Sequence, residues 1–330
     1  PGEEVGVKLR EPSQTTKEVV FADLVTIKQA HPKRIDSGPF SAGTPWQNLT
    51  YDQQLSFKQD MLRDVLAYYG KFKVEELPLQ SIIPSAEQKH YRNKITLNFF
   101  AGGLGTYEAE SHVIGPDHQQ LLVPAFISEL IDRLEKYFLD KGLVPYDRKA
   151  DSGDFRQLVL KWNKRSEVLL GLVTRHKTMP LREKLAKELP RFSTEHCKII
   201  GVVQNINKLA DDNILGPKSR AIWGNEYLAE EIGATNFQHT LASFFQVNSA
   251  VAENIIALIE AALPVNPSGL LYDLYGGIGF LSIPLAKRFA QIVIVENNQE
   301  AIEMAAANCR RNKVANAVCI QEDAEEFLQK

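Results

Sequence analysis

The spacing of apolar residues predicts a mixed α and β fold for the middle of the chain. Residues 125–140 form the clearest helix, which ends before Gly142 and whose apolar stripe consists of Ile127, Leu130, Ile131, Leu134 and Phe138. Residues 157–162 and 167–174 are apolar runs joined by a short polar turn, the pattern of two neighbouring strands. Residues 198–204 predict another strand.

The first 74 residues divide into three predicted pieces. Residues 1–35 alternate between apolar and polar positions, which predicts a small β-rich element. Residues 36–49 contain several Gly and Pro residues and are expected to form a loop. Thr50 and Gln53 form a capping-box signal for a helix that is expected to end at Gly70, with an apolar face made of Leu55, Leu62, Leu66 and Tyr69.

From residue 241 helices and strands alternate regularly. The pattern predicts a helix at 249–262, followed by strand, helix, strand, helix and strand at 270–274, 280–289, 292–295, 299–312 and 317–320. This β-α-β-α-β order is the first half of a doubly wound parallel sheet, so the expected fold class is α/β. Such a sheet normally has several more strands, and the sequence begins without Met. We therefore expect a fragment that is cut at both ends.

Composition narrows the functional class. The chain has 330 residues, of which 44% are apolar and 24% charged, as in ordinary globular proteins. A formal net charge of −3 gives no overall basic field, so contact with nucleic acid would depend on a local patch. No apolar run approaches about 18 residues, so no membrane span is expected. Three cysteines without a CxxC pattern, and histidines without metal-binding spacing, predict a reducing cytoplasmic setting and no metal site.

Residues 272–282 read YDLYGGIGFLS and carry the clearest chemical signal. A strand that leads into a glycine-rich turn and a helix is typical of a nucleotide-like cofactor site, and Gly277 lets a ligand approach without a β-carbon in the way. Glu296, at the end of the next strand, is placed to accept hydrogen bonds from ribose hydroxyls. Asp273, just before the turn, would repel a pyrophosphate but attract the sulfonium and ammonium groups of S-adenosylmethionine.

These features favour S-adenosylmethionine and leave two alternatives open. The first is NAD or FAD, although the G-x-G-x-x-G pattern is incomplete because Ser282 takes its third glycine position. The second is a plain βαβ unit with a tight turn and two surface carboxylates. Asp323 follows the third strand, where it can meet an adenine amino group or cap the next helix.

Five stretches of sequence resemble one family. LASFFQVN at 241–248, followed by YDLYGGIGFLSIPLA at 272–286, is similar to the RNA uracil-5-methyltransferases, which use S-adenosylmethionine to make 5-methyluridine in tRNA and ribosomal RNA. YRNK at 91–94 and WQNLTY at 46–51 resemble two further segments of that family. Residues 1–5 resemble the middle of TRAM, a small β-barrel RNA-binding domain that many members carry.

The resemblance implies a chain of four parts. Residues 1–35 would be a partial TRAM-like β-barrel, and residues 36–74 a loop with a linker helix. Residues 75–240 would be a central α+β domain that binds RNA. Residues 241–330 would be the first half of a Rossmann-like class I methyltransferase domain that binds S-adenosylmethionine.

The resemblance also implies roles for single residues. Four residues fall where the family contacts S-adenosylmethionine: Gln246, Tyr275, Phe280 and Glu296. Phe280 departs from the Asn or Thr that is common at its position. With Asp273, Gly277 and Asp323 these residues make the predicted cofactor site.

RNA contact is expected at Arg92, Lys94 and Arg156, because charged groups with aromatic residues nearby suit phosphate contact and base stacking. The alternative for each of the three is a solvated strand face.

Two departures from the family pattern change the expected chemistry. Residues 41–44 read SAGT where many members have the C-G-G-C ligands of an iron–sulfur cluster, so no such cluster is expected. The Asp-Pro-Pro segment, nucleophilic Cys and Glu base of the family lie beyond Lys330, so this chain alone is expected to be inactive. Cys197 and Cys309 are weaker candidates for the nucleophile, and Cys319 is expected in the core. A non-catalytic S-adenosylmethionine- and RNA-binding protein, or a dinucleotide-dependent oxidoreductase, is the alternative function.

Overall fold

The computed structural model describes residues 3–9, 22–35, 41, 43–108, 111, 113–209 and 213–330, and the chain divides into two units, Pro1–Pro84 and Ser85–Lys330. In the first unit, strands β1 (Glu4–Leu9) and β2 (Ala22–Gln29) pair antiparallel, as the alternation in residues 1–35 predicts. The part of that alternation at Val19 and Phe21 lies outside the described residues. The finer four-part division stays a prediction.

Helix α1 (Tyr51–Tyr68) begins where the capping box predicts. The Thr50 hydroxyl accepts a hydrogen bond from the Gln53 N–H at 3.4 Å. Its apolar side differs from the expectation of a buried face, because Leu62 is 47% and Tyr69 76% exposed, while Gln53 is the buried residue of the helix. A short 3-10 helix, η2 (Val74–Glu76), follows.

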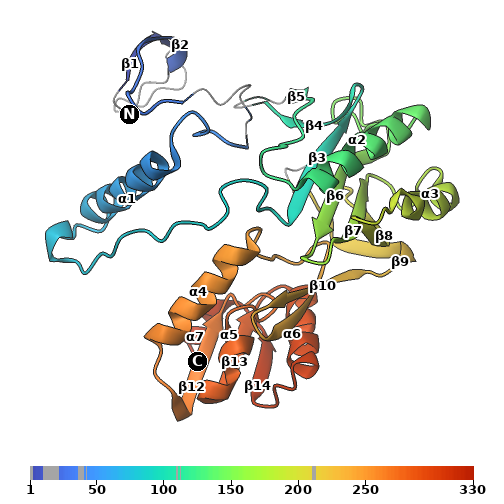
Figure 1. The fold of residues 1–330 in the computed structure, drawn as a ribbon. Helices are drawn as coiled ribbons and strands as arrows, with labels where there is room; N and C mark the ends of the chain where they lie inside the picture. The colour runs from blue at the N-terminus through green and yellow to red at the C-terminus, as the bar shows by residue number, and fades with distance from the viewer. Residues whose placement is uncertain are drawn as a thin grey trace. The chain divides into compact units, whose positions relative to one another are not determined.

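The second unit begins with a seven-stranded sheet in the order β5-β4-β3-β6-β7-β8-β9 (Figure 1). Its pairs are antiparallel except for β7 with β8, which is parallel. The sheet carries the predicted strands at 157–162, 167–174 and 198–204. The strands are β3 (Lys94–Phe100), β4 (Gly103–Tyr107), β5 (Ile114–Gly115), β6 (Phe155–Trp162), β7 (Glu167–Thr174), β8 (Lys198–Ile206) and β9 (Lys218–Gly224).

Helix α2 (Ala125–Asp140) has the predicted bounds and packs its apolar stripe on this sheet. All five predicted stripe residues are buried, and Gly142, with φ of +64°, follows the last turn. Helix α3 (Arg182–Glu188) and the 3-10 helix η3 (Leu189–Phe192) contribute Leu185 and Leu189 to the same core.

The rest of the second unit is an α/β layer that begins with a hairpin of β10 (Tyr227–Ile232) and β11 (Thr235–Thr240). Strands β12, β13 and β14 then form a parallel sheet in that order, so the predicted β-α-β-α-β pattern is confirmed. The elements are α4 (Ser249–Ala262), β12 (Asn266–Leu274), α5 (Ser282–Leu285), η4 (Ala286–Arg288), β13 (Phe289–Glu296), α6 (Gln299–Arg311), β14 (Ala317–Gln321) and α7 (Ala324–Leu328).

Helix α5 is shorter than the predicted helix at 280–289. Gly279 has φ of +79°, a left-handed conformation that ends the glycine turn and cannot belong to a right-handed helix. At the other end, Phe289 already belongs to β13. The segment between the turn and the second strand therefore holds one short α-helix and one 3-10 turn.

Asn308 on α6 attaches the β10–β11 hairpin to the α/β layer. Its side chain is fully buried; Oδ1 accepts from the Gln238 N–H at 2.7 Å, and Nδ2 donates to the Gln238 carbonyl at 3.1 Å. The same Nδ2 donates to the carbonyl of Ile278 in the glycine turn at 3.3 Å. One amide thus holds the hairpin and the turn together.

Among the described residues, no helix combines the length and the apolar character that crossing a membrane requires.

We expect Asn308→Ala to lower the free energy of unfolding by about 2–3 kcal/mol, because it leaves buried backbone groups of Gln238 and Ile278 without partners. Arg311→Ala removes an exposed side chain from the same helix and should change it by less than about 0.5 kcal/mol. Urea denaturation followed by circular dichroism measures both values. Equal stabilities of the two variants would contradict this role for Asn308.

Candidate functional site

The glycine-rich turn of residues 275–279 joins β12 to α5. Gly277 and Gly279 have φ of +54° and +79°, and Tyr275 has φ of +57°. At Gly277 nothing lies within 4 Å of the position that a β-carbon would take, whereas at Gly279 such an atom would lie 2.7 Å from Ile283 Cδ1. Gly277 therefore presents open backbone to a ligand, while close packing excludes a side chain at Gly279.

Glu296 is the last residue of β13, and its side chain is hydrogen-bonded to this turn. Its Oε2 accepts a hydrogen bond from the Gly277 N–H at 3.0 Å, and its Oε1 accepts from the Asn298 N–H at 2.9 Å. Because each carboxylate oxygen has a second lone pair, the group can also accept hydrogen bonds from a ligand. The structure thus brings Glu296 directly beside the open backbone of Gly277.

Asp273 lies near the end of β12, at the same edge of the sheet. Among the described residues, its buried Oδ2 has no hydrogen-bond partner, and neither has the buried Oγ of Ser282. Burial raises the pKa of Asp273 above its usual value; the nearby Ser282 opposes this effect and the charge of Glu296 adds to it. A cation or N–H group of a ligand would complete the hydrogen bonding of this carboxylate.

Tyr275 and Asp323 lie at the N-terminus of α7. The Tyr275 ring is 64% exposed, and its hydroxyl donates to Glu325 Oε1 at 2.6 Å. Asp323 caps α7, because its Oδ1 accepts from the N–H groups of Glu325 at 3.0 Å and Glu326 at 3.3 Å. The capping interpretation of Asp323 is confirmed, and its contact with an adenine stays a prediction.

Residues 241–248, which we call the connector, pack against the turn through aromatic rings. Phe245 is 6% exposed, with its ring centroid 5.4 Å from that of Phe280 and 6.1 Å from that of Phe237. Phe280 is itself only 9% exposed. The ring of Phe280 therefore belongs to the core. The predicted contact of Phe280 with the cofactor would have to come from its backbone.

Lys161 on β6 and Asn93, the residue before β3, hold the connector from the other side. Lys161 is 2% exposed, and its Nζ donates to the carbonyls of Thr240 and Ser243, each at 2.7 Å. Asn93 donates from Nδ2 to the carbonyl of Gln246 at 2.8 Å. The backbone of Gln246 is thus fixed by a residue of the YRNK segment. Sequence reasoning did not assign this role to Asn93 or Lys161.

The three predicted RNA-contact residues have different surroundings. Arg92 is half-buried and donates from Nη1 to Gln119 Oε1 at 2.6 Å; Lys94 is also half-buried, and burial lowers its pKa. Arg156 does not have the exposure that the prediction requires, because it is only 9% exposed. Its Nη1 donates to the carbonyls of Asn207 at 3.1 Å and Leu209 at 2.6 Å. Arg156 lies on a buried central strand and secures the segment that follows β8.

The three cysteines lie in packed regions. Cys197 is 3% exposed, and burial raises its pKa to about 11. Cys309 is 5% exposed, and a hydrogen bond with Cys319 together with burial raises its pKa. Neither thiol is set to ionise near neutral pH. Cys319 packs beside Cys309 against the core of the α/β layer.

Comparisons with known proteins agree with this architecture. The model of the tRNA (uracil-5-)-methyltransferase family matches residues 213–330. An uncharacterized RNA methyltransferase from Lactiplantibacillus plantarum is 30% identical over 345 residues, which cover 100% of this chain and 72% of the relative. A second one, from Nostoc sp., is 30% identical over 327 residues, which cover 96% of this chain and 69% of the relative.

Among solved structures, the tRNA (uracil-54, C5)-methyltransferase of Pyrococcus abyssi in complex with S-adenosyl-L-homocysteine superimposes with a TM-score of 0.76. It is 25% identical, and the match covers 96% of this chain and 72% of that protein. The fold and these relatives define an RNA methyltransferase. The chain belongs to the tRNA (uracil-5-)-methyltransferase family, as the sequence motifs predict.

We expect Asp273→Asn to be more stable than the natural protein at pH 8, with the difference shrinking towards pH 4. Folding raises the pKa of Asp273, so the folded state holds a proton that the unfolded state releases. The carboxyl therefore lowers stability increasingly as the pH rises from about 4, the usual value for Asp, to its folded pKa. Thermal unfolding across this pH range tests the expectation. A variant that is less stable at pH 8 than at pH 4, relative to the natural protein, would contradict it.

Proposed function

We propose that this protein binds S-adenosylmethionine and methylates carbon 5 of a uridine in tRNA or ribosomal RNA. The observation that carries the proposal is the buried, unpartnered Oδ2 of Asp273 beside the open backbone of Gly277, in a member of this family. When bound, S-adenosylmethionine supplies a methyl group activated by its sulfonium. The tRNA named for the Pyrococcus abyssi enzyme favours tRNA as the substrate class.

The polar groups of the site fit this cofactor. Asp273 offers an unused acceptor to the ammonium group, and a carboxylate also stabilises a nearby sulfonium. Glu296 has remaining lone pairs for ribose hydroxyls next to Gly277. Tyr275 presents an exposed ring, and Asp323 follows the third strand, where we propose that it meets an adenine amino group. Gln246 faces the same site in this proposal, with its backbone fixed by Asn93.

A dinucleotide is a poorer match for these residues. Its pyrophosphate would lie against the turn, where Asp273 and Glu296 add two carboxylates, and like charges repel at this range. The same carboxylates favour a ligand that carries positive charge. The oxidoreductase alternative therefore lacks a group in this turn that would neutralise the phosphates.

We expect Asp273→Asn and Glu296→Gln each to weaken S-adenosylmethionine binding about tenfold or more, because each removes a charge-assisted hydrogen bond. Isothermal titration calorimetry measures the dissociation constants. Glu195→Gln, which changes a side chain that is 84% exposed, serves as a control that should bind like the natural protein. Binding of NAD in place of S-adenosylmethionine would reverse the assignment.

RNA contact belongs to the same proposal. Arg92 and Lys94 stand in the segment that also positions the connector, so RNA held there would lie close to the cofactor site. The β1–β2 pair is proposed as part of a TRAM-like RNA-binding element and the large sheet as the central RNA-binding domain. We propose a cytoplasmic setting, where tRNA and ribosomal RNA are found.

We do not propose an iron–sulfur cluster for this protein, although many family members carry the ligands for one. Ser41 and Thr44 carry hydroxyls where those members have thiolates, and the Thr44 N–H donates to the Ser41 carbonyl at 2.9 Å across a short turn. Within the described residues, no group of three or more His, Cys, Asp or Glu side chains is arranged to hold a metal ion.

The reaction needs a nucleophile that these three cysteines do not supply. Carbon 5 of uracil reacts with a methyl donor once a thiolate adds to carbon 6; a base then removes the carbon-5 proton and the thiolate leaves. Cys197 and Cys309 are buried thiols with raised pKa; the hydrogen bond with Cys309 lowers the pKa of Cys319, but that thiol is half-buried against the core of the α/β layer. We propose that residues 1–330 bind the cofactor and RNA, while the nucleophile and the base lie outside them.

We expect residues 1–330 alone to form no 5-methyluridine. The chain is incubated with S-adenosylmethionine and either tRNA or ribosomal RNA, and the digested RNA is analysed by mass spectrometry. Calorimetry on the same sample shows that the cofactor binds. Formation of 5-methyluridine that disappears in Cys197→Ser or Cys309→Ser would place the nucleophile within this chain and disprove the proposal.

A further inference from the structure

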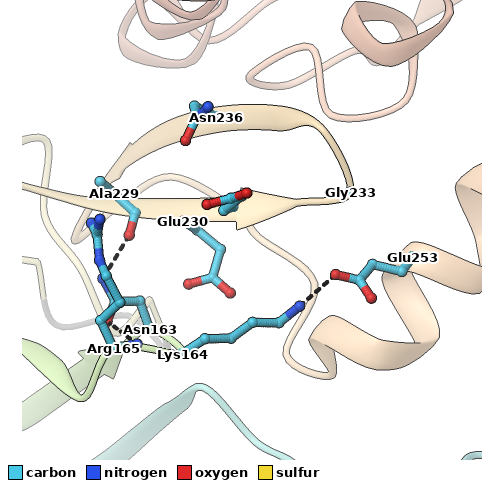
Figure 2. Close-up of a pocket in the computed structure, with 9 residues that line it drawn as sticks. Asn163, Lys164, Arg165, Ala229, Glu230, Gly233, Asn236 and Glu253 are labelled. Carbon is cyan, nitrogen blue, oxygen red and sulfur yellow. Dashed lines mark hydrogen bonds and ion pairs between the residues drawn. The ribbon is translucent and has the colours of Figure 1, made fainter.

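A polar pocket of about 250 Å³ opens where three elements of the second unit meet (Figure 2). The turn between β6 and β7, the β10–β11 hairpin and helix α4 provide its walls. Its lining residues are Asn163, Lys164, Arg165, Ala229, Glu230, Glu231, Gly233, Asn236 and Glu253. The volume is below the ~300–1,000 Å³ of most small-molecule sites, and it suits a ligand the size of one nucleobase.

Glu230 lies at the bottom of this pocket. It is 4% exposed, and its carboxylate points into the space between the turn and α4 (Figure 2). Oε1 accepts a hydrogen bond from the Ser249 hydroxyl at 3.2 Å. A carboxylate has about four acceptor positions, so Glu230 can accept from two further donors.

The basic side chains of the pocket form ion pairs with carboxylates other than Glu230. Lys164 extends across the opening to form an ion pair with Glu253, and Arg165 pairs with Glu167 at 3.1 Å. Within the described part of the chain, no salt bridge reaches the Glu230 carboxylate. Burial without such a partner raises the pKa of Glu230 to about 7. The backbone N–H of Lys164 and the charge of its side chain stabilise ionised Glu230 only in part, so among the described residues this buried acceptor remains without an ion-pair partner.

The charge of the lining excludes some ligand classes. Lys164 and Arg165 are balanced by Glu231 and Glu253, so ionised Glu230 leaves the pocket with one net negative charge. A phosphate would be repelled, whereas a neutral group with N–H donors would be bound. Nucleobases of unpaired RNA present such donors on their Watson–Crick edges.

The pocket is connected to the proposed cofactor site by a short chain of hydrogen bonds. The Ser249 hydroxyl donates to Glu230 and accepts from Asn93 Nδ2 at 3.1 Å. Asn93 Nδ2 also donates to the carbonyl of Gln246. A base in the pocket would therefore lie near the RNA segment that enters the methyl-transfer site.

We propose that this pocket binds an unpaired guanine of the RNA substrate, with its N1–H and its 2-amino group donating to Glu230. Guanine is the standard base whose Watson–Crick edge carries two adjacent donors, which match the two oxygens of a carboxylate. Adenine and cytosine offer one donor beside one acceptor, and uracil offers one donor between two acceptors. This inference rests on the proposed function, because it assigns a nucleotide of the RNA on which that function acts.

The test measures binding of short fluorescent oligoribonucleotides to the 330-residue chain by anisotropy at pH 8. The oligonucleotides are uridine runs with a central guanosine, inosine, adenosine, cytidine or uridine. We expect guanosine to bind about tenfold more tightly than inosine, which lacks the 2-amino group, and more tightly than the other three. Glu230→Gln should abolish the difference between guanosine and inosine.

Glu231→Gln is the matched control, because it removes the same charge from an exposed residue of the same pocket and should preserve the preference. The preference should also be stronger at pH 8 than at pH 6, because Glu230 ionises near pH 7. The charged groups that face Glu230 are Lys164 and Arg165 from the β6–β7 turn, Glu253 from α4 and Glu231 from its own hairpin.

Equal binding of guanosine and inosine, a preference that persists in Glu230→Gln, or no binding at about 1 mM overturns the inference. A cytidine preference at pH 6 also overturns it, since protonated Glu230 would then be the donor. Calorimetry with S-adenosylmethionine on the same samples separates the two proposals. Cofactor binding without a guanine preference rejects the pocket assignment alone, and a guanine preference without cofactor binding rejects the proposed function.

Discussion

Hydrogen bonds from the Lys161 amino group join the seven-stranded sheet to the segment that leads into the α/β layer. Lys161 lies on the central strand β6, and it donates to the carbonyl of Thr240, the last residue of β11, and to that of Ser243 in the connector. Burial lowers its pKa well below the usual value, and it contacts His239 Nδ1 at 3.4 Å. The free-energy cost of burying a lysine is reduced when its N–H groups have hydrogen-bond acceptors. Here these hydrogen bonds fix the segment from which Phe245 enters the α/β core.

Two carboxylates of this unit are buried at a free-energy cost that the fold does not offset. Asp273 at the glycine turn and Glu230 in the pocket both have a raised pKa, and burial is the main cause for each. Strongly perturbed groups of this kind concentrate at functional sites, because a ligand can supply the missing partner. A ligand with N–H or cationic groups at either position would supply a partner for the buried carboxylate.

The sequence predicted the elements whose limits are set locally. Helix α2 and helix α4 have the expected bounds, since an apolar stripe and its end signals are encoded within each segment. Helix α5 was predicted too long, because residues Ala286–Arg288 form a 3-10 turn and Phe289 already pairs in the parallel sheet. The positions of Asp273 and Glu296 at the carboxyl ends of neighbouring strands were predictable, because they follow from the βαβ order.

Residues whose roles depend on distant segments were not predictable in this way. Strand β6 is buried along its whole length, so alternation could not separate the structural Arg156 and Lys161 from surface residues. The pocket joins segments that are far apart in sequence. One local signal was available: Leu228, Glu230 and Ile232 alternate along β10 and are all buried, which places Glu230 on the inner face of the hairpin.

The side chain of Asn308 is hydrogen-bonded both to the β10–β11 hairpin and to the glycine-rich turn. Its Nδ2 donates both to Gln238 on β11 and to Ile278 between the glycines. A ligand that shifts either strand end changes the geometry available to the other. Any effect of RNA bound at the hairpin on cofactor affinity at the turn would, by linkage, be matched by an equal effect of the cofactor on RNA affinity. The order in which the two bind would leave this coupling unchanged.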